Sequence, residues 1–357
     1  MGGDYSMQTH HSMDAFDAAA LARLNTYLST HVHGFDGIQA LSKFEGGQSN
    51  PTYRMRTATR DYVLRTKPGP TSTLLQSAHA IDREYRVVSA LARTGIPVPE
   101  AYVYCADETI IGRQFYLMQF VSGRIFWDQA LPTLPAWERA AIYGEMNRVI
   151  AALHRVDPAT AGLGDFGKAG NYFGRQIARW TKQYRASQTQ ALPAMEQLME
   201  WLPENIPEGD ETCIVHGDFR LDNLVFHPSE PRVIAVLDWE LATLGHPLAD
   251  FSYHCLGYRI APHQFRGIAG LDLPSLGIPS EQAYISMYCE RTGRSRIDDW
   301  EYYIAYNLFR LAAILQGIAK RAEDGTASSA EAGRVGAQAR ALAELGWAAA
   351  VRSGKRR

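Results

Sequence analysis

The stretch Cys213–Asp250, CIVHGDFRLDNLVFHPSEPRVIAVLDWELATLGHPLAD, decides how the rest of the chain is interpreted. Its apolar beginning, Cys213–Val215, predicts a short strand, and the residues His216-Gly217-Asp218 predict a loop after it. A second apolar run, Val233–Leu237, predicts another strand, which places Asp238 at the strand's carboxyl end. The stretch therefore predicts a strand–loop–strand unit that carries acidic side chains at its turning points.

Three polar side chains of this unit, Asp218, Asn223 and Asp238, suit phosphoryl transfer, which needs positioned metal ions and an oriented hydroxyl group. Asp218 could accept the proton of an attacking hydroxyl group, while Asn223 and Asp238 offer the oxygen ligands that Mg²⁺ prefers. The alternative is that Asp218 and Asn223 only cap a turn, as such residues often do. The D-x-x-x-x-N spacing, combined with an aspartate at a strand end, favours the functional interpretation.

Size and composition narrow the class of protein. A chain of 357 residues favours two lobes or two domains, and a hydrophobic content of 46% is enough for a sizeable core. A formal net charge of −2 gives no support for a nucleic-acid-binding surface. The four cysteines are scattered without a CxxC pair, which is typical of reduced thiols in a cytoplasmic protein.

The ends of the chain and its most apolar run suggest no targeting segment and no membrane insertion. The N-terminus lacks a charged region followed by an apolar core, so residues 1–13 are expected to be disordered rather than a signal sequence. Residues 302–319 are interrupted by Asn307, Arg310 and Gln316, and a central arginine costs about 2.5–3.5 kcal/mol on insertion scales. This run is expected to be a buried helix, and the basic tail 353–357 a solvated terminus.

Hydrophobic periodicity predicts a small mixed lobe over residues 14–121. Asp14 is expected to cap a helix to about Ser29, with Phe16, Leu24 and Leu28 near one side. A second helix is expected at about 73–93, because apolar residues recur there at steps of three and four. Five antiparallel strands are expected at 38–44, 52–57, 62–66, 101–105 and 114–120.

The residues 122–352 are expected to form a larger, mainly helical lobe around the strand–loop–strand unit. Helices are predicted at about 137–155, 172–186, 193–201, 246–257, 280–292, 298–321 and 329–351. The predicted fold class is therefore α+β, with a small antiparallel-sheet lobe followed by a helical lobe.

The motif HGDFRLDN followed by VLDWE resembles the catalytic core of aminoglycoside phosphotransferase-like and choline-kinase-like enzymes. The resemblance implies a protein-kinase-like bilobal fold that uses ATP and Mg²⁺, with Asp218 as the base and Asn223 and Asp238 as metal ligands. His216 would be a structural loop residue. Trp239-Glu240 replaces the Phe-Gly of the protein-kinase D-F-G motif, so protein-kinase regulation is not carried over.

One more acid of the stretch leaves two interpretations open. Asp250, in HPLADF, is expected to open a helix. It could accept backbone N–H groups of the catalytic loop, or it could be an ordinary acid at a helix terminus.

The resemblance extends to the small lobe. FEGGQSN is similar to the loop that closes over nucleotide phosphates, and Arg65, in YVLR, stands where the family has a phosphate-binding cation, with Lys67 as a nearby alternative. Glu84 matches the acid that pairs with this cation, although it could instead be a solvated charge beside the apolar stripe. The loop residues that would offer backbone N–H groups or hydroxyls are Gly46, Gly47, Ser49 and Asn50.

The strand in YLMQFVSG resembles the hinge that receives adenine. Backbone groups of Gln119 and Val121 would form hydrogen bonds with the base. Met118 would shape the pocket, or could be an ordinary core residue.

A near-match to a P-loop and the scattered histidines do not predict further sites. GLGDFGKA, residues 162–169, lacks the final hydroxyl residue because Ala169 stands there, and a helix rather than a strand is expected before it. None of His216, His227, His246 and His254 forms an H-x-x-x-H pair, so no zinc site is expected.

A narrower resemblance concerns the acceptor. FEGGQSNPTY, GLGDFGKAGNYFGRQIARW and LDWELATLGHPLADF are similar to the kinase-like region found beside acyl-CoA dehydrogenases, which implies a hydroxyacyl-CoA or hydroxy acid as acceptor. Residues 252–321 hold six acids and eight bases, which gives no support for a polycationic aminoglycoside acceptor. The segment's speculative substrate contacts, which could equally pack as an ordinary helix, are Tyr172, Arg175, Gln176, Arg179 and Trp180.

Other functions stay open at this stage. An aminoglycoside or other small-alcohol kinase would share the same motifs, and a pseudokinase would bind nucleotide without turnover. A protein kinase is disfavoured, because D-F-G and A-P-E segments are missing. A homodimer is possible on the sequence alone.

Overall fold

The computed structural model describes residues 9–11, 16–44, 50–68, 80–326 and 332–355. The chain divides into two compact units. Unit 1 comprises Met1–Ile125, Ala159–Leu163 and Asp222–Ala242, and unit 2 comprises Phe126–Pro158, Gly164–Leu221 and Thr243–Arg357. A division of the sequence at residue 121 does not anticipate the two later segments of unit 1.

The described part of unit 1 contains a six-stranded antiparallel sheet in the order β1-β2-β3-β4-β6-β5. Its strands are β1 (Thr9–His11), β2 (Ala40–Phe44), β3 (Thr52–Arg56), β4 (Asp61–Thr66), β5 (Ala101–Cys105) and β6 (Phe115–Gln119). The five predicted strands are present. The prediction of disorder through residue 13 is wrong for residues 9–11, because β1 pairs with β2 and satisfies backbone groups at its edge.

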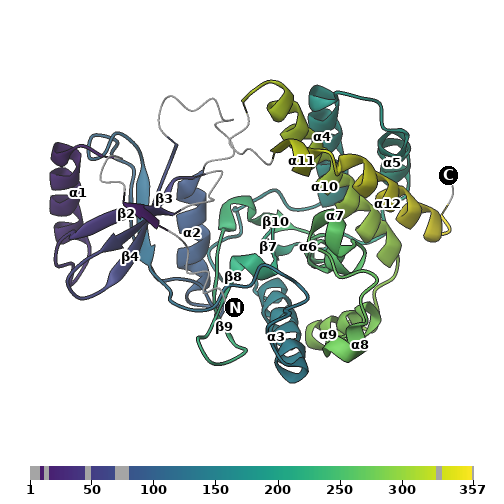
Figure 1. Ribbon diagram of the computed structural model, residues 1–357, viewed down its shortest axis with the longest axis horizontal. Helices are drawn as coiled ribbons and strands as arrows, with labels where there is room; N and C mark the ends of the chain where they lie inside the picture. Colours follow the sequence, from purple (N-terminus) through teal and green to yellow (C-terminus); the bar gives the residue numbers. More distant parts are fainter. Residues whose placement is uncertain (1–8, 12–15, 45–49, 69–79, 327–331, 356–357) are drawn as a thin grey trace. The chain divides into compact units, whose positions relative to one another are not determined.

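Each face of this sheet is covered by one helix, α1 (Ala18–His31) on one side and α2 (Ile81–Leu91) on the other (Figure 1). The arrangement follows from the alternation of side chains along a strand. In β4, Tyr62 and Leu64 are buried in a cluster with Leu24 of α1, whereas Val63 is buried in a separate cluster with Ile81 of α2.

Both helices of unit 1 differ from prediction at their beginnings. The cap of α1 is Asp17, whose side chain accepts a hydrogen bond from the Ala20 N–H at 2.6 Å, and the expected cap Asp14 lies outside the described residues. Helix α2 begins at Ile81 instead of Thr73, because Ala80 has a non-helical ψ of 76°. Residues 69–79 are not among those described.

The segment Asp222–Ala242 forms a hairpin of β8 (Leu224–Phe226) and β9 (Val233–Val236), flanked by the 3₁₀ turns η3 (Leu221–Asn223) and η4 (Trp239–Leu241). Strand β8 was not predicted. The hairpin joins unit 1 through main-chain contacts. Arg124 exchanges two backbone hydrogen bonds of 2.8 Å with Phe226, and a Cβ on Gly123 would lie only 2.2 Å from the Phe226 oxygen.

Unit 2 is mainly helical and is built around α10 (Trp300–Glu323), which is buried over most of its length and packs against α4, α5, α6, α11 and α12 (Figure 1). Strand β7 (Cys213–Val215) pairs with β10 (Thr243–Gly245). The other elements are α3 (Ala136–His154), α4 (Tyr172–Ser187), α5 (Pro193–Glu204), α6 (Pro247–His254), η5 (Cys255–Tyr258), α7 (Pro262–Phe265), α8 (Leu273–Leu276), α9 (Glu281–Thr292), α11 (Ala332–Gly336) and α12 (Ala339–Arg352).

The predictions for unit 2 hold for the long helices and fail at short ones. Residues 302–319 lie in the buried helix α10, as expected, and none of the described helices is long and apolar enough to cross a membrane. Helices α7 and α8 were not predicted. The single helix expected at 329–351 is wrong, because α11 ends at Gly336, where a Cβ would lie 2.6 Å from the Ala319 side chain of α10.

Candidate active site

The described part of unit 1 gathers three carboxylates around one arginine. Arg65 extends from β4, and its Nε atom lies 2.9 Å from the Glu84 carboxylate of α2. Its Nη2 atom donates hydrogen bonds to Asp238 at 2.9 Å and to Glu240 at 3.3 Å. The predicted Arg65–Glu84 pair is therefore present. Lys67, the alternative cation, forms no ion pair with any residue for which coordinates are described.

Burial dominates the electrostatics of this cluster. Glu84 is only 2% exposed, so it is not the solvated charge that the sequence left open. Burial raises the pKa of Glu84 to about 7, against the opposing attraction of Arg65. Burial also acts to lower the pKa of Arg65, but the charges of Glu84 and Asp238 outweigh it and keep the pKa above its ordinary value. Arg65 is thus held as a cation.

The β8–β9 hairpin brings the two predicted metal ligands close together. The backbone oxygen of Asn223 accepts a hydrogen bond of 2.8 Å from the N–H of Leu237, the residue before Asp238. Asp238 has a left-handed backbone with a φ of 64°, a conformation that aspartate adopts more readily than most residues and that often marks functional sites. Its side chain is 36% exposed, and hence accessible.

These two side chains fit Mg²⁺ by their chemistry, since an amide and a carboxylate are hard oxygen ligands. Among the described residues, no group of three or more His, Cys, Asp or Glu side chains could hold a metal ion on its own. A pair of protein ligands matches the way Mg²⁺ is usually bound, jointly by a few carboxylates, waters and substrate phosphates. Their role as ligands stays a prediction.

Only some of the predicted nucleotide-binding residues of unit 1 are among the residues that the structure describes. Gly46, Gly47 and Ser49 lie outside the described residues. Asn50 is 2% exposed, and its side-chain amide has no hydrogen-bond partner within the described chain. Its contact with the nucleotide stays a prediction. The Gln119 N–H donates to the Glu100 oxygen at 2.8 Å, which leaves the Gln119 carbonyl and Val121 as the predicted adenine contacts.

In unit 2, the half-buried Asp218 follows β7 and is held by two neighbouring side chains. The Tyr253 hydroxyl donates a hydrogen bond of 2.6 Å to Asp218 Oδ1, and the Arg220 Nε atom lies 3.3 Å from the same oxygen. The Asp218 N–H donates to His216 Nδ1 at 3.1 Å, which gives His216 the structural loop role that the resemblance implied. The carboxylate is thus fixed in direction.

Asp250 of α6 holds the loop that carries Asp218. Its two oxygens accept hydrogen bonds from the N–H groups of His216 at 2.7 Å and Gly217 at 2.8 Å, which confirms the loop-binding interpretation of this acid. His154 of α3 lies 3.2 Å from the same carboxylate. Burial acts to raise the pKa of Asp250, but the hydrogen bond and charge of His154 outweigh it and lower the pKa. The carboxylate therefore remains an acceptor.

Three residues that support the site were not predicted from the sequence: Arg310, Tyr253 and His154. Arg310 of α10 is 7% exposed, donates to the Gly217 oxygen at 2.6 Å and places its guanidinium 4.8 Å from the Tyr253 ring centre. Arg310 interrupts the apolar run 302–319, and a cation in such a run could have indicated a buried functional contact. Nothing in the sequence marks Tyr253 or His154, because their partners lie far away along the chain.

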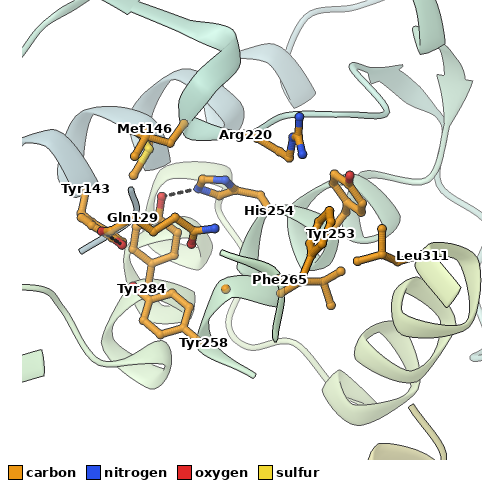
Figure 2. A pocket seen from close by; sticks show the side chains of 13 residues that line it. Gln129, Tyr143, Met146, Arg220, Tyr253, His254, Tyr258, Phe265, Tyr284 and Leu311 are labelled. Atoms are coloured by element: carbon orange, nitrogen blue, oxygen red, sulfur yellow. Dashed lines mark hydrogen bonds between the residues drawn. The ribbon is translucent and has the colours of Figure 1, made fainter. Parts of the chain in front are cut away.

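A small cavity of about 50 Å³ opens in unit 2 beside Tyr253 and Arg220 (Figure 2). Its walls are mainly aromatic and apolar, and the five predicted substrate contacts of 172–180 are not among them. The lining residues are Gln129, Tyr143, Met146, Arg220, Leu221, Tyr253, His254, Leu256, Gly257, Tyr258, Phe265, Tyr284 and Leu311.

The near-match to a P-loop has a packing explanation. An added Cβ on Gly167 would lie 2.4 Å from the Thr243 hydroxyl and 2.7 Å from the Leu244 nitrogen of β10. A helix, α3, precedes the segment, as expected. Gly167 is therefore required for close packing.

Comparison with known proteins gives a consistent assignment. Residues 40–275 match the family described as "Phosphotransferase enzyme family". Acyl-CoA dehydrogenase family member 10 of Mus musculus is 49% identical over 336 residues, which cover 93% of this chain and 31% of the mouse protein. The chain thus spans about a third of the length of that curated relative.

Two solved structures extend the comparison. A Ralstonia eutropha protein, provisionally described as an aminoglycoside phosphotransferase, is 56% identical with a TM-score of 0.87, over 94% of this chain and 99% of that one. A spectinomycin phosphotransferase in complex with ADP and spectinomycin is 12% identical with a TM-score of 0.61, over 92% and 98%. The second likeness concerns the fold alone.

Proposed function

The chain belongs to the phosphotransferase enzyme family, and from that premise we propose that it transfers the γ-phosphoryl group of ATP to a hydroxyl group of a small molecule. The observation that carries the proposal is the fixed carboxylate of Asp218, held by Tyr253 on a loop that Asp250 anchors. A general base must be held within reach of the proton that it removes.

The proposed reaction is a direct transfer. The acceptor oxygen forms a bond to the γ-phosphorus, and the bond from that phosphorus to the β,γ-bridging oxygen breaks with its electron pair remaining on ADP. The acceptor's hydroxyl proton passes to Asp218, and from there to solvent. Such reactions depend mainly on positioning and on compensating the charge of the phosphates.

Unit 1 supports the nucleotide's part in this proposal. Arg65 is a cation with a side chain only 12% exposed, which Glu84 orients, and it suits the binding of phosphate oxygens. Asn223 and Asp238 would hold Mg²⁺, which would supply positive charge to the phosphates. Main-chain groups of Gln119 and Val121 would receive the adenine.

The preferred acceptor is a hydroxyacyl-CoA or a hydroxy acid. A relative at 49% identity is named as an acyl-CoA dehydrogenase family member, and this chain covers 31% of its length. The lining of the unit 2 cavity, as far as the structure describes it, holds no carboxylate, which argues against a polycationic acceptor. An aminoglycoside remains the alternative suggested by the description of the Ralstonia eutropha protein.

Mass spectrometry tests the proposal by offering ATP and Mg²⁺ together with hydroxyacyl-CoAs, hydroxy acids, choline and aminoglycosides. A gain of one phosphate on a hydroxyacyl compound is expected, and EDTA should abolish it. Transfer to aminoglycosides alone would refute the acceptor while preserving the reaction type. No Mg²⁺-dependent transfer to any acceptor, with nucleotide binding retained, would instead indicate a pseudokinase.

The role of Asp218 is tested with a substitution that keeps its shape. Asp218→Asn should lower kcat by about 10²–10⁴-fold, because the amide cannot accept the acceptor's proton. Glu230→Gln makes the same charge change on the exposed turn of the β8–β9 hairpin and should leave kcat unchanged. Full activity in a folded Asp218→Asn protein would remove this residue as the base.

A further inference from the structure

We propose that the cavity of unit 2 is the acceptor subsite, and that it binds an uncharged, oxygen-bearing acyl or alkyl end of the acceptor through Tyr258 and Gln129. This inference rests on the proposed function, because it assigns the second substrate of that reaction. It adds the residues that select the acceptor and the chemical class that they select.

The cavity adjoins the proposed base within the same unit. Two of its lining residues, Tyr253 and Arg220, also contact Asp218 Oδ1, at 2.6 Å and 3.3 Å. A molecule whose end occupies the cavity can therefore bring a neighbouring hydroxyl group toward Asp218. Figure 2 shows that Tyr253 and Arg220 lie on the same side of the cavity.

The charges of the lining do not favour a cationic ligand. Among the described residues, no Asp or Glu lines the cavity, and Arg220 is the one permanently charged side chain of the lining. Burial lowers the pKa of His254 to about 4, so this ring is neutral at pH 7, and its Nε2 atom forms a hydrogen bond of 2.7 Å with the Tyr284 hydroxyl. Burial raises the pKa of Tyr143, Tyr253, Tyr258 and Tyr284, which keeps their hydroxyls protonated.

One hydroxyl group of the lining has no hydrogen-bond partner among the described residues. The Tyr258 hydroxyl is inaccessible to solvent and forms no hydrogen bond with any residue that the structure describes. A buried donor without an acceptor costs free energy, so such a group is expected to meet a ligand or a water molecule. The other tyrosines of the lining have partners, such as the Gln129 oxygen for Tyr143 at 2.8 Å.

The absence of a side chain on Gly257 leaves room for the Gln129 amide in the cavity wall. A Cβ on Gly257 would lie 1.9 Å from Gln129 Oε1, so only glycine permits this amide to lie against η5. Gln129 and Tyr258 thus provide an amide and a hydroxyl in a mainly aromatic and apolar wall (Figure 2). Such a wall suits hydrocarbon that carries one carbonyl or hydroxyl oxygen.

Calorimetry tests this subsite without requiring turnover. The probes are butyryl-CoA, which has no hydroxyl group to phosphorylate, and free CoA, which lacks the acyl end. Tyr258→Phe removes the unpartnered hydroxyl and keeps the ring. It should raise the Kd of butyryl-CoA by about 3- to 10-fold, the range for one net hydrogen bond, and leave that of CoA unchanged.

Tyr62→Phe is the matched control, because it removes another buried hydroxyl that has no partner in the described structure, in the core of unit 1. It should leave both Kd values unchanged. Equal affinities of Tyr258→Phe and the unaltered protein for butyryl-CoA would overturn the subsite. So would the absence of any gain in affinity from CoA to butyryl-CoA, or tighter binding of kanamycin or choline at the same site.

The acceptor screen separates this inference from the proposed function. If hydroxybutyryl-CoA is phosphorylated but its KM is the same in Tyr258→Phe, the reaction stands and the subsite fails. If butyryl-CoA binding depends on Tyr258 while nothing is phosphorylated, the subsite stands and the reaction fails. The two proposals therefore have distinct outcomes.

Discussion

At the scale of single residues, the setting of Asp218 shows how a reactive carboxylate is held by side chains from distant parts of the sequence. Tyr253 donates a hydrogen bond of 2.6 Å to it, and Arg310 packs 4.8 Å from the centre of the same tyrosine ring. The guanidinium also donates to the Gly217 oxygen at 2.6 Å. Tyr253 is thus a positioning residue, and the buried Arg310 guanidinium packs against its ring.

Tyr253→Phe should separate positioning from folding. The variant keeps the ring that packs on Arg310 but loses the hydrogen bond to Asp218, so kcat should fall by about 10- to 150-fold, the range for the loss of one charge-assisted bond. The KM for ATP should not change. Steady-state kinetics with the best acceptor measures both values.

The control for this variant is Tyr302→Phe. Tyr302 is also a buried tyrosine of unit 2, and its hydroxyl donates to the Leu202 oxygen at 3.3 Å, outside the loop of Asp218. It should lose some stability and keep its kcat. A similar loss of kcat in both variants would show that Tyr253 acts through general stability alone.

At the scale of elements, the loop of Asp218 depends on the first turn of α6. Asp250 accepts two backbone N–H groups there, from His216 and Gly217, and is 2% exposed. In Asp250→Asn, an amide NH₂ must replace one of the accepting oxygens and would face a donor. The free energy of unfolding should fall by about 1–3 kcal/mol, the cost of leaving a buried donor unsatisfied.

Urea unfolding of Asp250→Asn measures this loss, and Asp272→Asn serves as its control. Asp272 caps the short, exposed helix α8, where asparagine is an equally good cap, so its variant should differ little from the unaltered protein. Unchanged stability in Asp250→Asn would mean that the loop is held chiefly by other contacts, such as that of Arg310.

Elements were predictable where local pattern and burial agree. The strand β4 was predicted within one residue of its bounds, the apolar stripe of α2 predicted the part of that helix from Ile81 onward, and the motif around Asp218 predicted the loop. The short strand β8, three residues long, was missed. The break between α11 and α12 was missed as well; it lies beside the close approach of Gly336 to α10, a contact distant in sequence.

At the scale of the whole molecule, the division into units follows contacts that no local pattern contains. The segment Asp222–Ala242 belongs to unit 1 although the residues before and after it belong to unit 2. Main-chain bonds such as Val236 N–H to the Pro97 oxygen, at 2.8 Å, determine this membership. Of the candidate site, the motif residues could be predicted from sequence, whereas the cavity and Tyr253 required the folded chain.

The stability of the whole molecule should respond to pH through buried histidines. Burial lowers the pKa of His246 and of His254 to about 4 each. In the unfolded chain, histidine has a pKa of about 6.5, so the unfolded state binds more protons than the folded state between these values. Each histidine therefore costs stability as pH falls from about 6.5 to 4. Glu84, whose pKa burial raises to about 7, acts in the opposite direction over much of this range.

A single substitution isolates one histidine from these opposing effects. His246 caps α6 by accepting the Leu248 N–H, and His246→Asn preserves a capping side chain while removing the titrating ring. Between pH 6 and pH 4.5, the stability of this variant should decline by about 1.4 kcal/mol less per pH unit than that of the unaltered protein. Urea unfolding at each pH measures the two slopes, and His263→Gln, at an exposed position, should reproduce the original slope. Equal slopes in His246→Asn and the unaltered protein would mean that the pKa of His246 is the same in the folded and unfolded states.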